Sequence, residues 1–127
     1  LLKGKIKNKN ICFLGVTFKA NTDDMRDSSS LVMIPSLAKK GAIINYYDPT
    51  GEKNYFKKIK NVTFSQDIKS AIYNSDLVII HTEWNDFKAI NFKSLIKKKS
   101  FIIYDMRNIY SPSKMKKAKI KYFGIGR

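Results

Sequence analysis

The sequence predicts an α/β fold, a three-layer, doubly wound (Rossmann-like) parallel sheet of about five to six strands in the order 3-2-1-4-5-6. Short apolar runs alternate along the chain with stretches of about ten residues that read as helices. The runs are continuously apolar rather than alternating with polar residues, so we expect both faces of the sheet to be covered. Together these two features are typical of βαβ units.

The first half of the chain carries two expected strands joined by a helix. The expected elements are a strand over 11–17, a helix over 29–40 and a strand over 42–47. Gly15 lies near the end of the first strand, where a ligand or another backbone segment can approach closely. Any of Asp27 to Ser30 offers a capping oxygen, and Lys39 to Gly41 end the helix. Pro35 predicts a kink or a late start.

The second half repeats the alternation with shorter elements. We expect a lysine-rich, partly helical connection over 52–60, a short edge strand over 62–64, a helix that starts at 65–67, a strand over 77–80, a helix over 85–98, a strand over 101–104, a short helix from 111 and a last strand over 120–125. Ser65, Gln66 and Asp67 start the middle helix, and the Ser111-Pro112 pair opens the last one.

The length of 127 residues suits one compact domain, and the 43% share of hydrophobic residues argues against disorder. Residues 11–127 are assigned to this domain. Residues 1–10 are mostly polar and basic, and the chain does not begin with methionine. We therefore read residues 1–10 as a lead-in from a missing upstream domain.

The formal net charge of +15 is the most conspicuous feature of the composition. Taken alone, it favours an acidic partner such as nucleic acid or an anionic membrane. All but three of the 25 basic residues are lysine, however, and asparagine and isoleucine are also abundant. A codon bias across the genome explains this pattern better, so neither nucleic acid nor a membrane is expected as a partner.

One cysteine excludes an internal disulfide and a cysteine-based zinc site, and no metal ligand set is apparent. Cys12 falls within an expected buried strand, where a thiol is inert. No apolar run approaches the roughly 18 residues of a membrane-spanning helix, and the start lacks the apolar core of a secretory signal. A cytoplasmic location is the expectation.

Candidate binding residues follow three of the expected strands. In a doubly wound sheet, ligands bind beyond the carboxyl ends of the strands, at the switch between the first and fourth strands. The residues at those ends are Phe18, Lys19 and Arg26 after the first strand, Glu83 and Trp84 after the fourth, and Arg107 and Asn108 after the fifth. Lys19 and Arg107 therefore converge on one rim and predict a phosphate or pyrophosphate site.

Several neighbouring residues have more than one interpretation. The Asp23–Asp24 pair fits a metal or an acid–base couple, but capping of backbone N–H groups or pairing with Arg26 is the stronger expectation. His81 is read as structural or as a rim contact. Trp84 is as consistent with a packing anchor as with a ligand contact, and with Phe18 it can offer an apolar face to a base or sugar.

The turn after the first strand reads GVTFKA rather than GxGxxG. A dinucleotide held in the usual glycine-rich manner is therefore not expected in this domain. From the residues alone, the chain is an α/β domain that binds a phosphorylated ligand at its strand ends.

The segment LGVTFKANTDDMRDSSSL resembles the FK…TDD.R.S signature of the UDP-glucose/GDP-mannose dehydrogenase family, in its C-terminal UDP-binding domain. Further blocks follow in the order of that family: GAIINYYDP, SDLVIIHTEWNDF, YDMRNIY and YFGIGR. The resemblance runs from about residue 9 to the end of the chain. The TEW-x-x-F block is most similar to the branch that acts on UDP-glucose.

The resemblance implies a role for each matched position. Phe18 and Lys19 match the FK pair that lies against the UDP-sugar, and Arg107 matches a further substrate contact. Arg26 matches the arginine that reaches toward NAD held by the other domain. Ala20 and Asp27 replace a common proline and glutamate, which does not change the assignment.

Members of this family oxidise a nucleotide sugar in two NAD-dependent steps, here UDP-glucose to UDP-glucuronate, and the full-length enzymes are homodimers. The NAD-binding domain and the catalytic cysteine have no counterpart in this sequence, so we expect no catalytic residue here and no activity from this chain alone. Two alternatives stay open. One is a sibling dehydrogenase for GDP-mannose or UDP-N-acetylmannosamine, and the other is a non-enzymatic nucleotide- or RNA-binding module.

Overall fold

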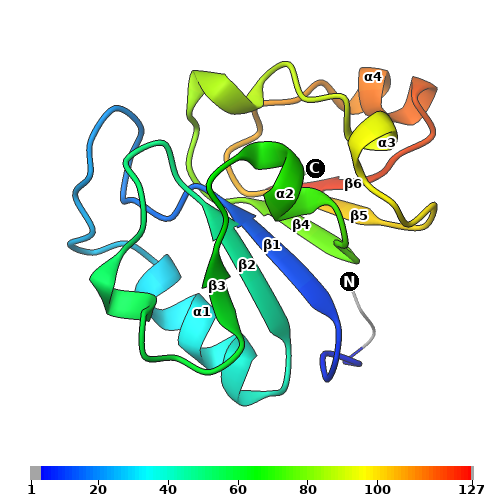
Figure 1. The fold of residues 1–127 in the computed structure, drawn as a ribbon. Coiled ribbons are helices and arrows are strands. Elements are labelled where there is room, and N and C mark those ends of the chain that lie inside the picture. The colour runs from blue at the N-terminus through cyan, green and yellow to red at the C-terminus, as the bar shows by residue number, and fades with distance from the viewer. Residues whose placement is uncertain (1–3, 127) are drawn as a thin grey trace.

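The computed structural model describes residues 4–126, and these residues form one parallel sheet with helices on both faces (Figure 1). The strand order is β3-β2-β1-β4-β5-β6, with every neighbouring pair parallel. The strands are β1 (Asn10–Leu14), β2 (Ile43–Tyr47), β3 (Val62–Phe64), β4 (Leu77–Ile80), β5 (Ile102–Asp105) and β6 (Lys121–Gly124). The predicted fold class and strand order are therefore confirmed. Residues 1–3 of the expected lead-in and Arg127 lie outside the described part.

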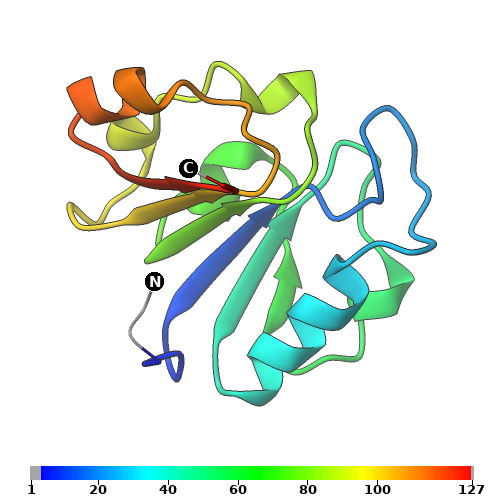
Figure 2. The ribbon, with the colours of Figure 1, turned by 180° about the vertical axis from the view of Figure 1, so that it is seen from behind.

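The helices are short apart from the first. They are α1 (Ser30–Lys39), α2 (Ile68–Ile72), α3 (Phe92–Leu95) and α4 (Pro112–Lys117), with the 3₁₀ turns η1 (Asn54–Phe56) and η2 (Asn85–Phe87). Figures 1 and 2 show α1 on one face of the sheet and α2 on the other. Among the described residues, no helix is long and apolar enough to cross a membrane.

The strands of the sheet, apart from the short edge strand β3, contribute side chains to two separate hydrophobic clusters. In β1, Phe13 packs in the cluster that holds Ile34 of α1, whereas Leu14 packs in the cluster that holds Ile72 of α2 and Phe92 of α3. Successive side chains of a strand point to opposite faces. Continuous apolar runs are therefore explained by a sheet that is buried on both sides, as the sequence predicts.

Capping residues and a glycine explain why several helices begin or end where the sequence predicts. Asp67 accepts a hydrogen bond from Ser70 N at 2.7 Å and caps α2, and Ser111 caps α4 in the same way through Lys114 N. Gly41 follows α1 with a φ of +95°, as expected at a helix end. Helix α1 does not start late, because Pro35 lies inside it.

The predicted helix over 85–98 is wrong. Instead, η2 ends at Phe87 and α3 begins at Phe92, with non-helical residues between them. Asn91 takes φ −90° and ψ +86° and accepts a hydrogen bond from Ser94 N, so it starts a new helix rather than continuing an old one. Phe87 and Phe92 enter the core from these two separate turns.

The first strand ends earlier than predicted, at Leu14, because the backbone turns at Gly15 with a φ of +80°. A Cβ atom added at Gly15 would lie 2.5 Å from Thr82 Cβ and 3.1 Å from Thr82 N. Glycine is required here for both reasons, since other residues disfavour this φ and any side chain meets Thr82. The close approach predicted for this position is confirmed.

We expect Gly15→Ala to lower the free energy of unfolding by about 3 kcal/mol, the sum of backbone strain and overpacking. Gly51→Ala is the matched control, because Gly51 also has a positive φ but an added Cβ meets nothing within 4 Å. That control should lose only about 1 kcal/mol. Urea unfolding of the two variants measures the difference, and equal losses would show that the contact with Thr82 carries no cost.

Candidate functional site: the rim at the carboxyl ends of the strands

The loop after β1 is held by the carboxylate of Asp48, which directly follows β2. Its Oδ2 atom accepts hydrogen bonds from Val16 N at 2.8 Å and Thr17 N at 3.3 Å, and its Oδ1 atom accepts one from Thr50 N at 3.0 Å. In glycine-rich dinucleotide folds, the turn after the first strand binds the pyrophosphate. Here the carboxylate of Asp48 already accepts hydrogen bonds from two amides of that turn, those of Val16 and Thr17. This agrees with the absence of a GxGxxG motif from the sequence.

The three carbonyl groups of Thr17, Phe18 and Lys19 are all fixed by hydrogen bonds. Thr82 Oγ1 donates to Thr17 O at 2.9 Å, Arg107 Nη2 donates to Phe18 O at 3.0 Å, and Thr17 Oγ1 donates to Lys19 O at 3.1 Å. The side chains of Phe18 and Lys19 remain exposed. The loop therefore presents one aromatic ring and one cation on a backbone that is held in place.

Arg107, which follows β5, crosses to this loop from a position 89 residues away in sequence. Its Nε donates to His81 O at 2.9 Å and its Nη2 to Phe18 O at 3.0 Å. A guanidinium group carries five N–H donors, and within residues 4–126 only these two carbonyls accept a hydrogen bond from this side chain. The remaining donors are available for an anion. The sequence-predicted residues Phe18 and Arg107 are thus brought into direct contact.

The three serines at the start of α1, Ser28 to Ser30, alternate in direction. The hydroxyls of Ser28 and Ser30 each lie 2.6 Å from Val16 O, whereas Ser29 Oγ lies 2.8 Å from His81 Nε2. The expected capping role is met only through a 3.3 Å bond from Ser30 N to Ser28 Oγ, and Ser29, at the N-cap, makes no side-chain cap bond. The serines instead join α1 to the loop and to the end of β4.

Arg26 pairs with Asp24, which confirms the stronger of the two interpretations of the acidic pair. Its Nε and Nη2 atoms donate to the two carboxylate oxygens at 3.0 Å each, and its side chain is 85% exposed. The hydrogen bonds from Arg26 hold the pKa of Asp24 below its usual value. Within residues 4–126, no group of acidic, histidine or cysteine side chains is arranged to hold a metal ion.

His81 is buried at the end of β4. Burial, and to a lesser extent the charge of Arg107, lowers the pKa of His81 to about 4, while the carboxylate of Asp48 opposes the shift. His81 is structural, because its side chain is buried, and it also contributes to the rim, because its backbone carbonyl accepts a hydrogen bond from Arg107. Cys12 is a free thiol buried inside β1, as predicted, and burial raises its pKa.

Trp84 is a packing anchor, since it lies in the same hydrophobic cluster as Phe87 and is 8% exposed. Its indole nitrogen has no hydrogen-bond partner among the described residues. Glu83 is exposed. Asn108, the other residue expected at the strand ends, donates from Nδ2 to Ile125 O at 2.9 Å and so serves the structure of the C-terminal segment.

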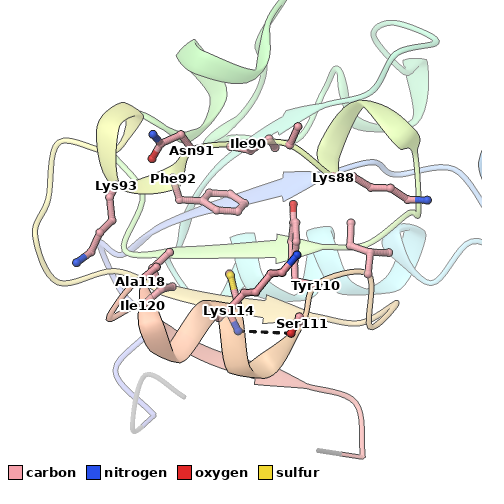
Figure 3. A pocket seen from close by; sticks show the side chains of 13 residues that line it. Lys88, Ile90, Asn91, Phe92, Lys93, Tyr110, Ser111, Lys114, Ala118 and Ile120 are labelled. Carbon is pink, nitrogen blue, oxygen red and sulfur yellow. Dashed lines mark hydrogen bonds between the residues drawn. The ribbon is translucent and has the colours of Figure 1, made fainter.

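A pocket of about 580 Å³ lies away from these loops, between α3 and α4 (Figure 3). Phe92 and Tyr110 line it, while the side chains of Lys88 and Lys93 extend away from its centre in Figure 3. Phe18, Lys19 and Arg107 do not line this pocket. We therefore take the rim at the strand ends, and not the pocket, as the candidate site.

Sequence reasoning missed three residues that shape this rim: Ser29, Asp48 and Thr82. Asp48 directly follows a strand that neighbours β1, and this signal was available, because polar residues at the carboxyl ends of adjacent parallel strands meet. Ser29 and Thr82 carry no comparable signal, since serine and threonine are common in turns.

The fold and the rim define a doubly wound α/β domain with two cations and an exposed aromatic ring at its switch point. The family model described as UDP-glucose/GDP-mannose dehydrogenase family, UDP binding domain, matches residues 12–112. The chain belongs to this family, as its five sequence blocks predict.

Named relatives agree with that assignment, and a solved structure shares the fold. The UDP-glucose 6-dehydrogenase of Rhizobium meliloti is 39% identical over 98% of this chain, and that of Bacillus subtilis named YwqF is 34% identical over 98%. The chain spans only 29% of the length of each. An NDP-N-acetyl-D-galactosaminuronic acid dehydrogenase of Methanosarcina mazei shares the fold, with a TM-score of 0.82 at 23% identity, over 97% of this chain and 26% of that one.

We expect stability to depend on His81 below neutral pH. In the unfolded chain its imidazole binds a proton near its ordinary pKa of 6.5, whereas in the folded chain it does so only near 4. The unfolded state therefore binds more protons in this window, and the free energy of unfolding falls by up to about 3 kcal/mol as the pH drops through it.

Urea unfolding between about pH 7 and pH 5.5 measures this slope, in a window that lies above the range in which ordinary carboxylates titrate. The His81→Gln variant lacks the titrating group, so its stability should change less across the same window. An identical slope in both proteins would contradict the assignment to His81.

Proposed function

We propose that this chain is the UDP-sugar-binding C-terminal domain of an NAD-dependent UDP-glucose 6-dehydrogenase. The observation that carries the proposal is the guanidinium group of Arg107, held between the carbonyls of His81 and Phe18 and beside the loop of Lys19. A diphosphate carries adjacent negative charges, and a fixed arginine with a neighbouring lysine matches them in geometry and charge. The names of the relatives support the choice of UDP-glucose.

In this proposal each exposed group of the rim has one task. Arg107 and Lys19 bind the phosphates, and the ring of Phe18 covers an apolar face of the base or sugar. The backbone beneath them needs no rearrangement, because the carbonyls of the loop already have donors. Such preorganisation lowers the entropic cost of binding.

The cofactor is proposed to bind mainly to the upstream domain. The amides of Val16 and Thr17 already bind Asp48, so this domain does not offer the usual dinucleotide cradle. Arg26, which is exposed on the same loop and paired with Asp24, is proposed to contact NAD held by the other domain. NAD would accept a hydride in each of the two oxidations. The full-length enzyme is proposed to be a cytoplasmic homodimer.

Calorimetric titration of the chain with UDP, UDP-glucose, GDP-mannose and a short RNA tests the proposal. We expect one-site binding of the UDP ligands, weakened by roughly 10- to 100-fold in Lys19→Ala and Arg107→Ala, the range for lost hydrogen bonds to a charged group. Lys57→Ala removes an exposed lysine next to η1 and serves as the matched control.

Because Arg107→Ala also frees two backbone carbonyls, Arg107→Lys is measured beside it. Lysine keeps the charge but cannot bridge both carbonyls and a phosphate, so its affinity should fall as well. A preference for GDP-mannose would move the chain to a sibling enzyme. Binding of RNA with a steep salt dependence and no preference among nucleotides would overturn the proposal.

We also expect no turnover from this chain alone. Incubation with UDP-glucose and NAD should produce no NADH absorbance, because the proposed hydride acceptor and the catalytic cysteine belong to the upstream part of the enzyme. An intact relative from the same family, assayed in parallel, is the positive control. Measurable NADH from the isolated chain would contradict this division of labour between the domains.

A further inference from the structure

Four groups at the rim form a hydrogen-bond chain with a fixed direction. Thr82 Oγ1 donates its one proton to Thr17 O at 2.9 Å, so it can only accept from His81 Nδ1, which lies 3.1 Å away. The imidazole therefore carries its proton on Nδ1. Its Nε2 is then an acceptor, and Ser29 Oγ, at 2.8 Å, must be the donor.

The same histidine is the point where three parts of the rim meet. Its ring links Ser29, at the start of α1, to Thr82, at the end of β4. Its backbone carbonyl accepts from Arg107 Nε, and Thr82 continues the chain to the loop that presents Phe18 and Lys19. His81 is 1% exposed, so it is placed to act through its neighbours rather than on a ligand directly.

We propose that His81, as the neutral Nδ1–H tautomer, is a positioning residue for the nucleotide-sugar site. Its hydrogen bonds with Ser29, Thr82 and Arg107 hold the site in its binding geometry. The proposal rests on the proposed function, because the site it serves is the one formed by Lys19 and Arg107. A sibling dehydrogenase with the same rim would use His81 in the same way.

Burial of the ring is the main reason that it stays in the neutral form that this role requires. Arg107 contacts the residue through its carbonyl and also disfavours a second positive charge, while the carboxylate of Asp48 and the backbone of Gly15 act in the opposite sense. An imidazolium ion would donate from both nitrogens, so Ser29 would have to reverse its hydrogen bond. At neutral pH the chain of donors therefore keeps one direction.

The first experiment reads the tautomer without any ligand. The sequence contains a single histidine, so long-range ¹H–¹⁵N NMR spectra of the imidazole need no assignment. We expect a protonated Nδ1 and an unprotonated Nε2 at about pH 7, a tautomer set by the partner of each nitrogen. Thr82→Val removes the acceptor for Nδ1–H and should change this pattern. A protonated Nε2 in the unmodified chain would overturn the inference.

The second experiment measures UDP affinity in Ser29→Ala, which changes an exposed residue and leaves the core intact, and in Thr82→Val. The expected loss in each is about three- to tenfold, the range for one hydrogen bond. Ser36→Ala in the same helix and Thr63→Val on β3 are the matched controls, since both residues are exposed and outside the chain of donors.

The outcomes separate the inference from the proposed function. Weaker UDP binding in Ser29→Ala and Thr82→Val, with wild-type affinity in both controls, supports the positioning role. Wild-type affinity in Ser29→Ala and Thr82→Val overturns it, while the proposed function stands. Failure of the unmodified chain to bind UDP would count against the proposed function, and the tautomer measurement would still decide the direction of the hydrogen-bond chain.

Discussion

The rim depends on one carboxylate placed where another protein of this fold would bind a phosphate. Asp48 accepts hydrogen bonds from the amides of Val16 and Thr17 and from the turn of Thr50. Buried amides need partners, and a carboxylate is a strong acceptor for them. Because the internal anion fixes the start of the loop, the next residues can point their side chains outward. An external anion then meets Lys19 and Arg107 instead of the backbone.

The loop after β1 is held from both halves of the sheet. Asp48 comes from β2 on one side, while Thr82 and Arg107 come from β4 and β5 on the other. Gly15 allows the backbone to pass closely enough to Thr82 for these bonds to form. A doubly wound sheet places its switch point at this position, so the topology itself brings the two sets of side chains to one loop.

Much of this could be predicted from the sequence, because the relevant signals are local. Continuous apolar runs such as Leu77–Ile80 predict a sheet buried on both faces, and residues that follow strands, such as Phe18 and Arg107, were predicted to share a rim. The break at Asn91 was missed because an apolar pattern does not report the backbone angles of one residue. The direction of each serine from Ser28 to Ser30 also depends on neighbours that are distant in the chain.

The hydrogen bond from Arg107 to the carbonyl of Phe18 makes the geometry of the rim depend on strands from both halves of the chain. The loop lies near the start of the sequence, yet its hydrogen bonds are complete only when β4 and β5 are in the sheet. Contacts between residues so distant in sequence form slowly during folding, since a large loop must close first. A ligand of this rim binds only the finished structure, and so it shifts the folding equilibrium of the entire domain rather than of one loop.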